Sequence, residues 1–311
     1  MRKDTIVIGT RSSKLALWQA DYIQAKLRER YPELPVVEKR MTTKGDRVLD
    51  APLAKIGGKG LFTKELEQAM LAGEIDIAVH SLKDMPTELP PGLVLAAVTE
   101  RFDAGDAVVS PRYGTLANLP QGAKVGTSSL RRRAQLLAQR PDLEIVSLRG
   151  NVNTRLQKLE DEDFDAIILA VAGLKRLGFG ERITEVLDKS VCLPAVGQGA
   201  LAIEARADDE EMISRLAFLD DAAMRAAARA ERAFLARVEG GCQVPVGVYA
   251  TAEGTTLAIE AVIASLDGAR LYRSSRTGSA SEAEALGRGL AEELLAAGGE
   301  AILQELGLLQ D

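Results

Sequence analysis

The chain has 311 residues, of which 46% are hydrophobic and 27% charged, with a formal net charge of −6. This length exceeds that of a usual single domain, and the composition is typical of a globular protein rather than a disordered chain. The acidic balance argues against nucleic acid as a partner, no apolar run could span a bilayer, and one histidine with two cysteines argues against a His/Cys zinc site.

Strand and helix patterns alternate through the first third of the chain. We expect buried strands at 5–10, 36–41, 75–80 and 93–98, and helices at 15–31 and around 62–70. The polar stretch 100–106 contains Gly105, which suits a crossover into a second domain.

A second α/β series follows this crossover. We expect strands at 123–126, 144–148 and 166–171, and helices at 130–139 and 152–161. The alternation predicts a largely parallel sheet covered by helices, with ligands beyond the C-terminal strand ends. Residues 8–13 echo 125–129, which indicates two similar α/β domains that present helix N-termini to a shared cleft. Common turn and cap chemistry explains the echo equally well.

The last third of the chain changes pattern. A second crossover at 194–200 precedes a strand at 200–205, a long helix at 221–239, strands at 246–251, 256–264 and 269–277, and helices at 282–297 and 300–306. Runs of strands followed by helices indicate an α+β domain with a small antiparallel sheet.

The segment 126–133 carries the strongest functional signal. Three hydroxyl residues, Thr127, Ser128 and Ser129, end a strand and open a helix that begins with arginines. A helix N-terminus with hydroxyls and guanidinium groups favours an anion. Basic residues recur near other predicted strand ends, and the whole set is Arg11, Lys83, Arg131, Arg132, Arg149, Arg155 and Arg176. For any one of these arginines a solvated surface position is the alternative, but the set together favours binding of several carboxylates.

Three further motifs leave alternatives open. Lys55 and Lys59 lie in a glycine-rich segment that lacks the Walker A spacing, so we interpret it as a basic lid or an ordinary loop. Asp84, next to Lys83 at a strand end, could form a simple ion pair. Two glycines leave Cys242 approachable, so it is a covalent anchor or nucleophile, or else a small buried group, whereas Cys192 is expected in the core.

Seven ordered motifs across nearly the whole chain resemble the porphobilinogen deaminase family, also called hydroxymethylbilane synthase. They occupy residues 16–20, 53–62, 80–86, 126–132, 148–152, 193–199 and 239–245. The resemblance implies two α/β domains of the type II periplasmic-binding-protein class around a cleft, formed by 1–99 with 200–219 and by 100–199. It also implies a smaller α+β domain, 220–311, with a three-stranded antiparallel sheet and the cofactor cysteine.

The resemblance also implies the reaction and its cofactor. Four porphobilinogen molecules are joined head to tail with loss of ammonia, on a dipyrromethane primer attached through a thioether to Cys242, and hydrolysis then releases hydroxymethylbilane for tetrapyrrole and haem biosynthesis. Asp84 would be the catalytic carboxylate that steadies the cationic azafulvene left when ammonia departs. The acetate and propionate groups of the pyrroles explain a basic cleft in an acidic protein.

The family motif extends to the residues that hold the ligands. The expected cofactor-binding residues are Ser81, Lys83, Asp84, Thr127, Ser129, Arg131, Arg132 and the covalent anchor Cys242. The expected substrate-binding residues are Arg11, Ser13, Lys55, Lys59, Arg149, Arg155, Arg176, Gln198 and Gly199.

These inferences describe a transferase that we expect to be monomeric. We expect it in the cytoplasm, because no signal-peptide core follows Met1. We expect no metal and no nucleic-acid or membrane partner. The alternative is a non-catalytic two-domain receptor for anions, which explains a cleft but neither the Gly-Gly-Cys loop nor a third domain. A cysteine-dependent transferase without a pyrrole cofactor is a second alternative.

Overall fold

The computed structural model describes residues 5–43, 45, 60–238 and 244–308. The chain forms two compact units, one of Met1–Arg101 with Ala200–Ala222 and one of Phe102–Gly199 with Ala223–Asp311. Within the described ranges, no helix is long and apolar enough to cross a membrane.

The first unit is built on a five-stranded sheet with the order β2-β1-β3-β10-β4. Its strands are β1 (Ile6–Arg11), β2 (Val36–Met41), β3 (Ile77–Ser81), β4 (Leu93–Val98) and β10 (Leu201–Arg206), and its helices are α1 (Lys14–Arg30), α4 (Lys64–Leu71) and α8 (Glu210–Leu216). β1 runs parallel to β2 and β3, whereas β10 runs antiparallel to both of its neighbours, β3 and β4.

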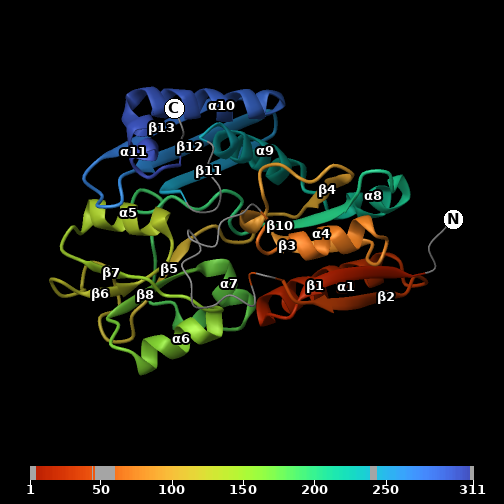
Figure 1. The fold of residues 1–311 in the computed structure, drawn as a ribbon, viewed down its shortest axis with the longest axis horizontal. Helices are drawn as coiled ribbons and strands as arrows, with labels where there is room; N and C mark the ends of the chain where they lie inside the picture. The colour runs from red at the N-terminus through yellow and green to blue at the C-terminus, as the bar shows by residue number, and fades with distance from the viewer. Residues whose placement is uncertain (1–4, 44, 46–59, 239–243, 309–311) are drawn as a thin grey trace. The chain divides into compact units, whose positions relative to one another are not determined.

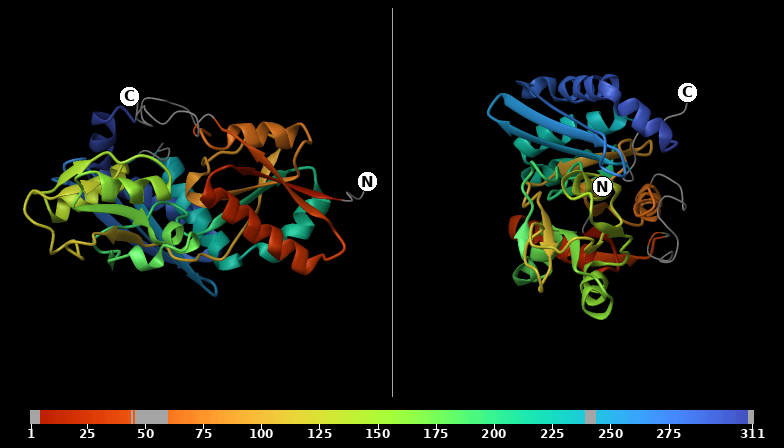
Figure 2. Two further views of the ribbon diagram at one scale, coloured as in Figure 1. Left: turned by 90° about the horizontal axis from the view of Figure 1, so that it is seen from below. Right: turned by 90° about the vertical axis from the view of Figure 1, so that its left-hand side faces the viewer.

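Helices α1 (red) and α4 (orange) cover opposite faces of this sheet, as the left view of Figure 2 shows. Successive side chains of β1 point to opposite faces of the sheet, which explains this arrangement. Ile6 and Ile8 lie in the core on the α1 side, and Val7 packs against the core on the α4 side. Ile23 of α1 and Leu66 of α4 are fully buried in these two cores. The sheet therefore has an apolar layer on each face, as expected for a largely parallel sheet.

The second unit contains a five-stranded sheet with the order β7-β6-β8-β5-β9. Its strands are β5 (Asp106–Val109), β6 (Lys124–Gly126), β7 (Glu144–Val146), β8 (Ala166–Ala170) and β9 (Glu185–Val186), and its helices are α5 (Leu130–Gln139), α6 (Val152–Asp161) and α7 (Val171–Arg176). β6 is parallel to β7 and β8, and β5 is antiparallel to β8 and β9. The two α/β sheets thus share one plan, with a single reversed strand in the fourth position.

The second unit also contains a three-stranded antiparallel sheet, β11-β12-β13. Its strands are β11 (Val246–Glu253), β12 (Thr256–Ala264) and β13 (Leu271–Ser279), and the helices of this part are α9 (Ala222–Arg237), α10 (Ala283–Leu294) and α11 (Glu300–Glu305). α10 lies over β12 and β13 (Figure 1). Nε of Arg133 in α5 donates to the carbonyl of Leu266, so the turn between β12 and β13 is joined to α5.

The predicted α/β class is confirmed in its two five-stranded, helix-covered sheets and its separate three-stranded antiparallel sheet. The predicted crossover at 100–106 is wrong at its end, because Asp106 begins β5. The prediction also missed β5, α7, α8 and the short β9. The three domain boundaries stay predictions.

Candidate active site

One pocket of the first unit gathers predicted site residues at the carboxyl ends of two parallel strands. Arg11 ends β1 and Ser81 ends β3, while Asp84 lies in the short 3₁₀ turn Leu82–Asp84 that follows β3. These three residues line the pocket together with Ser13, Gln19 and Phe62, among others. The carboxyl ends of parallel strands meet at one edge of a sheet, which explains how distant segments reach one pocket.

Local contacts fix the side chains around this pocket. The guanidinium of Arg11 lies 4.2 Å from the centre of the Phe62 ring. Gln19 Nε2 donates to Ser81 Oγ at 2.7 Å, and Ser13 Oγ accepts from the backbone N–H of Ala16 at the start of α1. The pocket therefore combines a cation, two hydroxyls and the Asp84 carboxylate, a set that can bind an anionic group and stabilise a developing cation. Lys83 lies beside Asp84 in the same turn.

The second unit repeats the same strand-to-helix geometry at the segment that gave the strongest sequence signal. β6 ends at Gly126, and Ser129 caps α5 by accepting from the backbone N–H of Arg132. Thr127 Oγ1 accepts from the N–H of Ser129 at 3.2 Å, and Ser128 Oγ donates to the carbonyl of Leu148 at 2.7 Å. Ser13 and Ser129 thus hold equivalent cap positions, so the echo between the two segments reflects equivalent structure.

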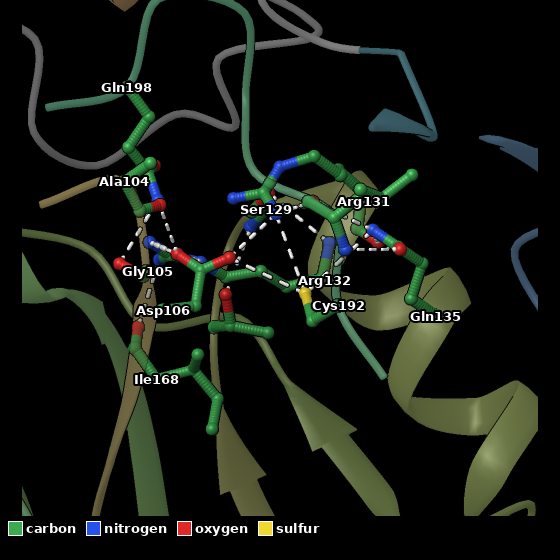
Figure 3. Close-up of polar contacts among 12 residues, drawn as sticks. Ala104, Gly105, Asp106, Ser129, Arg131, Arg132, Gln135, Ile168, Cys192 and Gln198 are labelled. Carbon is green, nitrogen blue, oxygen red and sulfur yellow. Dashed lines mark hydrogen bonds and ion pairs between the residues drawn. The ribbon is translucent and has the colours of Figure 1, made fainter. Parts of the chain in front are cut away.

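Arg131 and Arg132 are both buried and share one carboxylate, that of Asp106 (Figure 3). Nη1 of Arg131 donates to Asp106 Oδ2 at 2.6 Å, and Nε and Nη2 of Arg132 donate to Oδ1 at 3.0 and 2.7 Å. Gln198 Nε2 donates to the same Oδ1 at 2.9 Å. Burial raises the pKa of Asp106, but the two guanidinium groups outweigh burial and hold that pKa well below its usual range.

Asp106 is the member of this buried cluster that sequence reasoning missed. The apolar run that follows it, from Ala107 to Val109, was the available signal, because it marks a buried strand beginning with a carboxylate. Since two guanidinium groups face one carboxylate, the cluster retains one excess positive charge for a further anion. The binding of cofactor by Arg131 and Arg132 stays a prediction.

Cys192 lies in the same cluster and is only 1% exposed, which confirms its expected place in the core. Its Sγ donates to Asp106 Oδ2 at 3.4 Å. Burial, followed by the negative charge of Asp106, raises the pKa of the Cys192 thiol to about 12. The thiol is therefore neutral near pH 7 and a poor nucleophile.

Three other predicted arginines lie in the second unit. Arg149 follows β7 and has a buried Nη1 for which the described ranges offer no hydrogen-bond partner. Nε of Arg155, in the first turn of α6, donates to the carbonyl of Gly150 at 2.7 Å. Nη2 of Arg176, at the end of α7, donates to the carbonyl of Gly199 at 2.8 Å.

The predicted site residues Lys55, Lys59 and Cys242 lie outside the described residues.

Comparison with known proteins gives matches over nearly the full chain. Residues 6–214 match the family model "porphobilinogen deaminase, dipyromethane cofactor binding domain", and residues 226–296 match "porphobilinogen deaminase, C-terminal domain". The protein named porphobilinogen deaminase from Syntrophotalea carbinolica is 54% identical, covering 98% of this chain and 97% of the relative. Its namesake from Roseiflexus castenholzii is 56% identical, covering 97% and 99%.

Solved structures give a more distant likeness. A putative methionine-binding lipoprotein of Bacillus subtilis matches with a TM-score of 0.45 and 16% identity, over 70% of this chain and 91% of that chain. The aliphatic sulphonate binding protein SsuA of Escherichia coli matches with a TM-score of 0.41 and 16% identity, over 75% and 70%. These values carry no information on function. The two family models and the full-length relatives agree, and the chain belongs to the porphobilinogen deaminase family.

Proposed function

We propose that this chain is a transferase that joins four porphobilinogen molecules head to tail with loss of ammonia and releases hydroxymethylbilane by hydrolysis. Family membership over nearly the whole chain carries this proposal. The pocket of Arg11, Ser13 and Asp84 supports it, because porphobilinogen has two carboxylates and becomes a cation when its ammonia leaves.

The family's dipyrromethane cofactor fits the residues that are present. When bound through a thioether, it supplies the pyrrole carbon to which the first substrate is joined. The chain has two cysteines, and Cys192 is buried, neutral and bonded to Asp106, so we assign the thioether to Cys242. The excess positive charge around Asp106 suits carboxylate side chains. We propose Ser81, Lys83, Asp84, Thr127, Ser129, Arg131 and Arg132 as its non-covalent partners.

Asp84 is the residue to which we assign the main electrostatic contribution. A carboxylate about 4 Å from a unit positive charge, at an effective dielectric constant of about 20, attracts it by roughly 4 kcal/mol. If this attraction is realised only in the transition state, it accelerates the reaction by about a thousandfold. Arg11, placed against Phe62, would hold a substrate carboxylate while Asp84 faces the cation.

The remaining basic residues would hold the carboxylates of the growing chain. We propose Arg149, Arg155 and Arg176 for this role, with Gln198 and Gly199 beside them. The buried, unpartnered Nη1 of Arg149 supports its part, since the described residues leave this donor unsatisfied and a ligand carboxylate would satisfy it. The roles of Lys55 and Lys59 stay predictions, as do the three-domain division, the monomeric state and the cytoplasmic location.

Incubation of the purified chain with porphobilinogen tests the proposed function. We expect four molecules of ammonia for each linear tetrapyrrole released. The intact mass should exceed the chain mass by two pyrrole units, and Cys242→Ser should remove this excess, with Cys192→Ser as the matched control that keeps it. A chain that binds porphobilinogen and releases no ammonia would instead be an anion receptor.

A further inference from the structure

Three buried titratable side chains meet on one face of the first sheet, outside the residues assigned above. They are Glu67 of α4, His80 of β3 and Glu204 of β10, and none is more than 6% exposed. In the sheet register His80 pairs with Ala202 and Ala78 pairs with Glu204, so His80 and Glu204 are diagonal neighbours on one face. Nε2 of His80 lies 3.4 Å from Oε2 of Glu204.

These groups are poorly satisfied for buried polar atoms. Glu67 Oε1, both carboxylate oxygens of Glu204 and Nε2 of His80 have no hydrogen bond of ordinary geometry within the described ranges. Such a cluster costs stability, so its presence calls for a functional reason. It is not arranged as a metal site, because the described residues hold no group of three His, Cys, Asp or Glu side chains suited to a metal ion.

The cluster reaches the candidate active site through two side chains. His80 and Thr63 line the same pocket as Asp84. Thr63 stands at the start of α4, where its hydroxyl does not cap the helix, and it lies close enough to Glu67 to lower the pKa of that carboxyl. His80 therefore borders the pocket that contains Asp84 and also lies against the buried carboxyl group of Glu204.

The neighbours of Glu67 shift the pKa of its carboxyl group. Burial raises the pKa of Glu67, and the charges of Glu204 on β10 and Glu65 on α4 raise it further, while Thr63 and His80 lower it. The Glu204 carboxyl group therefore faces both Glu67 and His80, and its Oε2 lies 3.4 Å from the imidazole Nε2. An imidazole that faces a buried carboxylate on one nitrogen can take up a proton on the other, because the carboxylate stabilises the resulting cation.

The proposed reaction needs such a proton acceptor. Each condensation forms a C–C bond, breaks the C–N bond of the aminomethyl group with its electron pair leaving on nitrogen, and breaks a C–H bond of a pyrrole ring with its pair remaining in the ring. The protonated aminomethyl group leaves as neutral ammonia. The proton lost from the ring passes first to a base on the protein and then to this ammonia, which departs as ammonium. We propose that His80, which lines the pocket, accepts this ring proton, with the Glu204 carboxyl group beside its Nε2 stabilising the imidazolium.

This inference rests on the proposed function, and its test separates the two. His80 is the only histidine, so its ¹⁵N resonances in the holoenzyme can be followed against pH without assignment. Glu204→Gln should displace their pH profile, whereas the exposed control Glu74→Gln should leave it close to that of the wild type. Because burial raises the pKa of Glu67, infrared spectra followed against pH should show a protonated carboxyl band that persists above the usual range of a glutamate, that Glu67→Gln removes and that Glu74→Gln retains. Neither measurement depends on turnover.

Kinetics then tests the role of His80 in catalysis. His80→Gln should lower kcat by about a hundredfold, the lower end of general acid–base contributions, with little change in KM and loss of the acid limb of the pH–rate profile. Glu204→Gln should also lower kcat, whereas Glu74→Gln should leave kcat unchanged. Should His80→Gln not fold, Glu204→Gln decides the matter. An unchanged acid limb in the folded variant, or ¹⁵N resonances indifferent to Glu204→Gln, would overturn the proposal.

Discussion

Asp106→Asn is the substitution whose effect the structure defines most sharply. It removes the only carboxylate bonded to both Arg131 and Arg132 among the described residues, and all three side chains are at least 94% buried. Loss of one partner of a buried ion pair typically costs about 3–5 kcal/mol, because uncompensated charge remains in the interior. We expect a loss of this size in the free energy of unfolding.

The partly exposed pair of Arg140 and Asp142 provides a matched control. Its Nη2–Oδ2 distance is 2.7 Å, the same as the distance from Arg132 Nη2 to Asp106 Oδ1, but its two side chains are 22% and 24% exposed. Ion pairs that solvent reaches contribute less than buried ones, so Asp142→Asn should lower stability by less than Asp106→Asn does. Urea unfolding followed by circular dichroism measures both variants. Equal losses in the two would refute the reasoning from burial.

The dependence of this difference on pH has a definite sign. Because the pKa of Asp106 is lower in the folded state than in the unfolded chain, its charge contributes fully above the unfolded pKa of about 3.9. The contribution then falls as the pH drops below that value towards the folded pKa. The stability difference between wild type and Asp106→Asn should therefore stay constant from pH 7 to about pH 5 and shrink in more acidic solution.

Three further outcomes follow from the site and the fold. Asp84→Asn should lower kcat by about a thousandfold in a steady-state assay on cofactor-loaded enzyme, and near-normal turnover would reject its role. Cys192 should resist iodoacetamide in the folded protein and react only after denaturation, as mass spectrometry of its peptide can show, because its thiol pKa is about 12. Gly268→Ala should lower the melting temperature, because Gly268 has a φ of 73° and a Cβ there would collide with the backbone of Ala138. An unchanged melting temperature would contradict this packing.

Features set by neighbouring residues were predictable from the sequence. The two strand-to-helix junctions that contain Ser13 and Ser129 follow from local pattern alone, and the sequence predicts both junctions. The bounds of α5 and α6 agree with the expected ranges for the same reason. Local chemistry is visible along the chain, so these elements required no knowledge of the tertiary structure.

Features set by distant partners were not predictable. Asp106 looks like part of a polar loop until Arg131 and Arg132, some 25 residues away, are brought onto it. Glu204 lies in a strand that was expected, but its burial depends on α4 and on the antiparallel register with β3. A charged residue in the interior is defined by its partners, and pattern analysis within a short window does not contain them.

The position of β10 has a consequence for how the protein is made. β4 joins the first sheet only through β10, whose residues follow the whole of the second α/β segment in the chain. A ribosome must therefore synthesise Leu201–Arg206 before the N-terminal sheet can close, and until then β3 and β4 expose unpaired edges. Nascent chains that stop short of this strand should be the ones most dependent on chaperones.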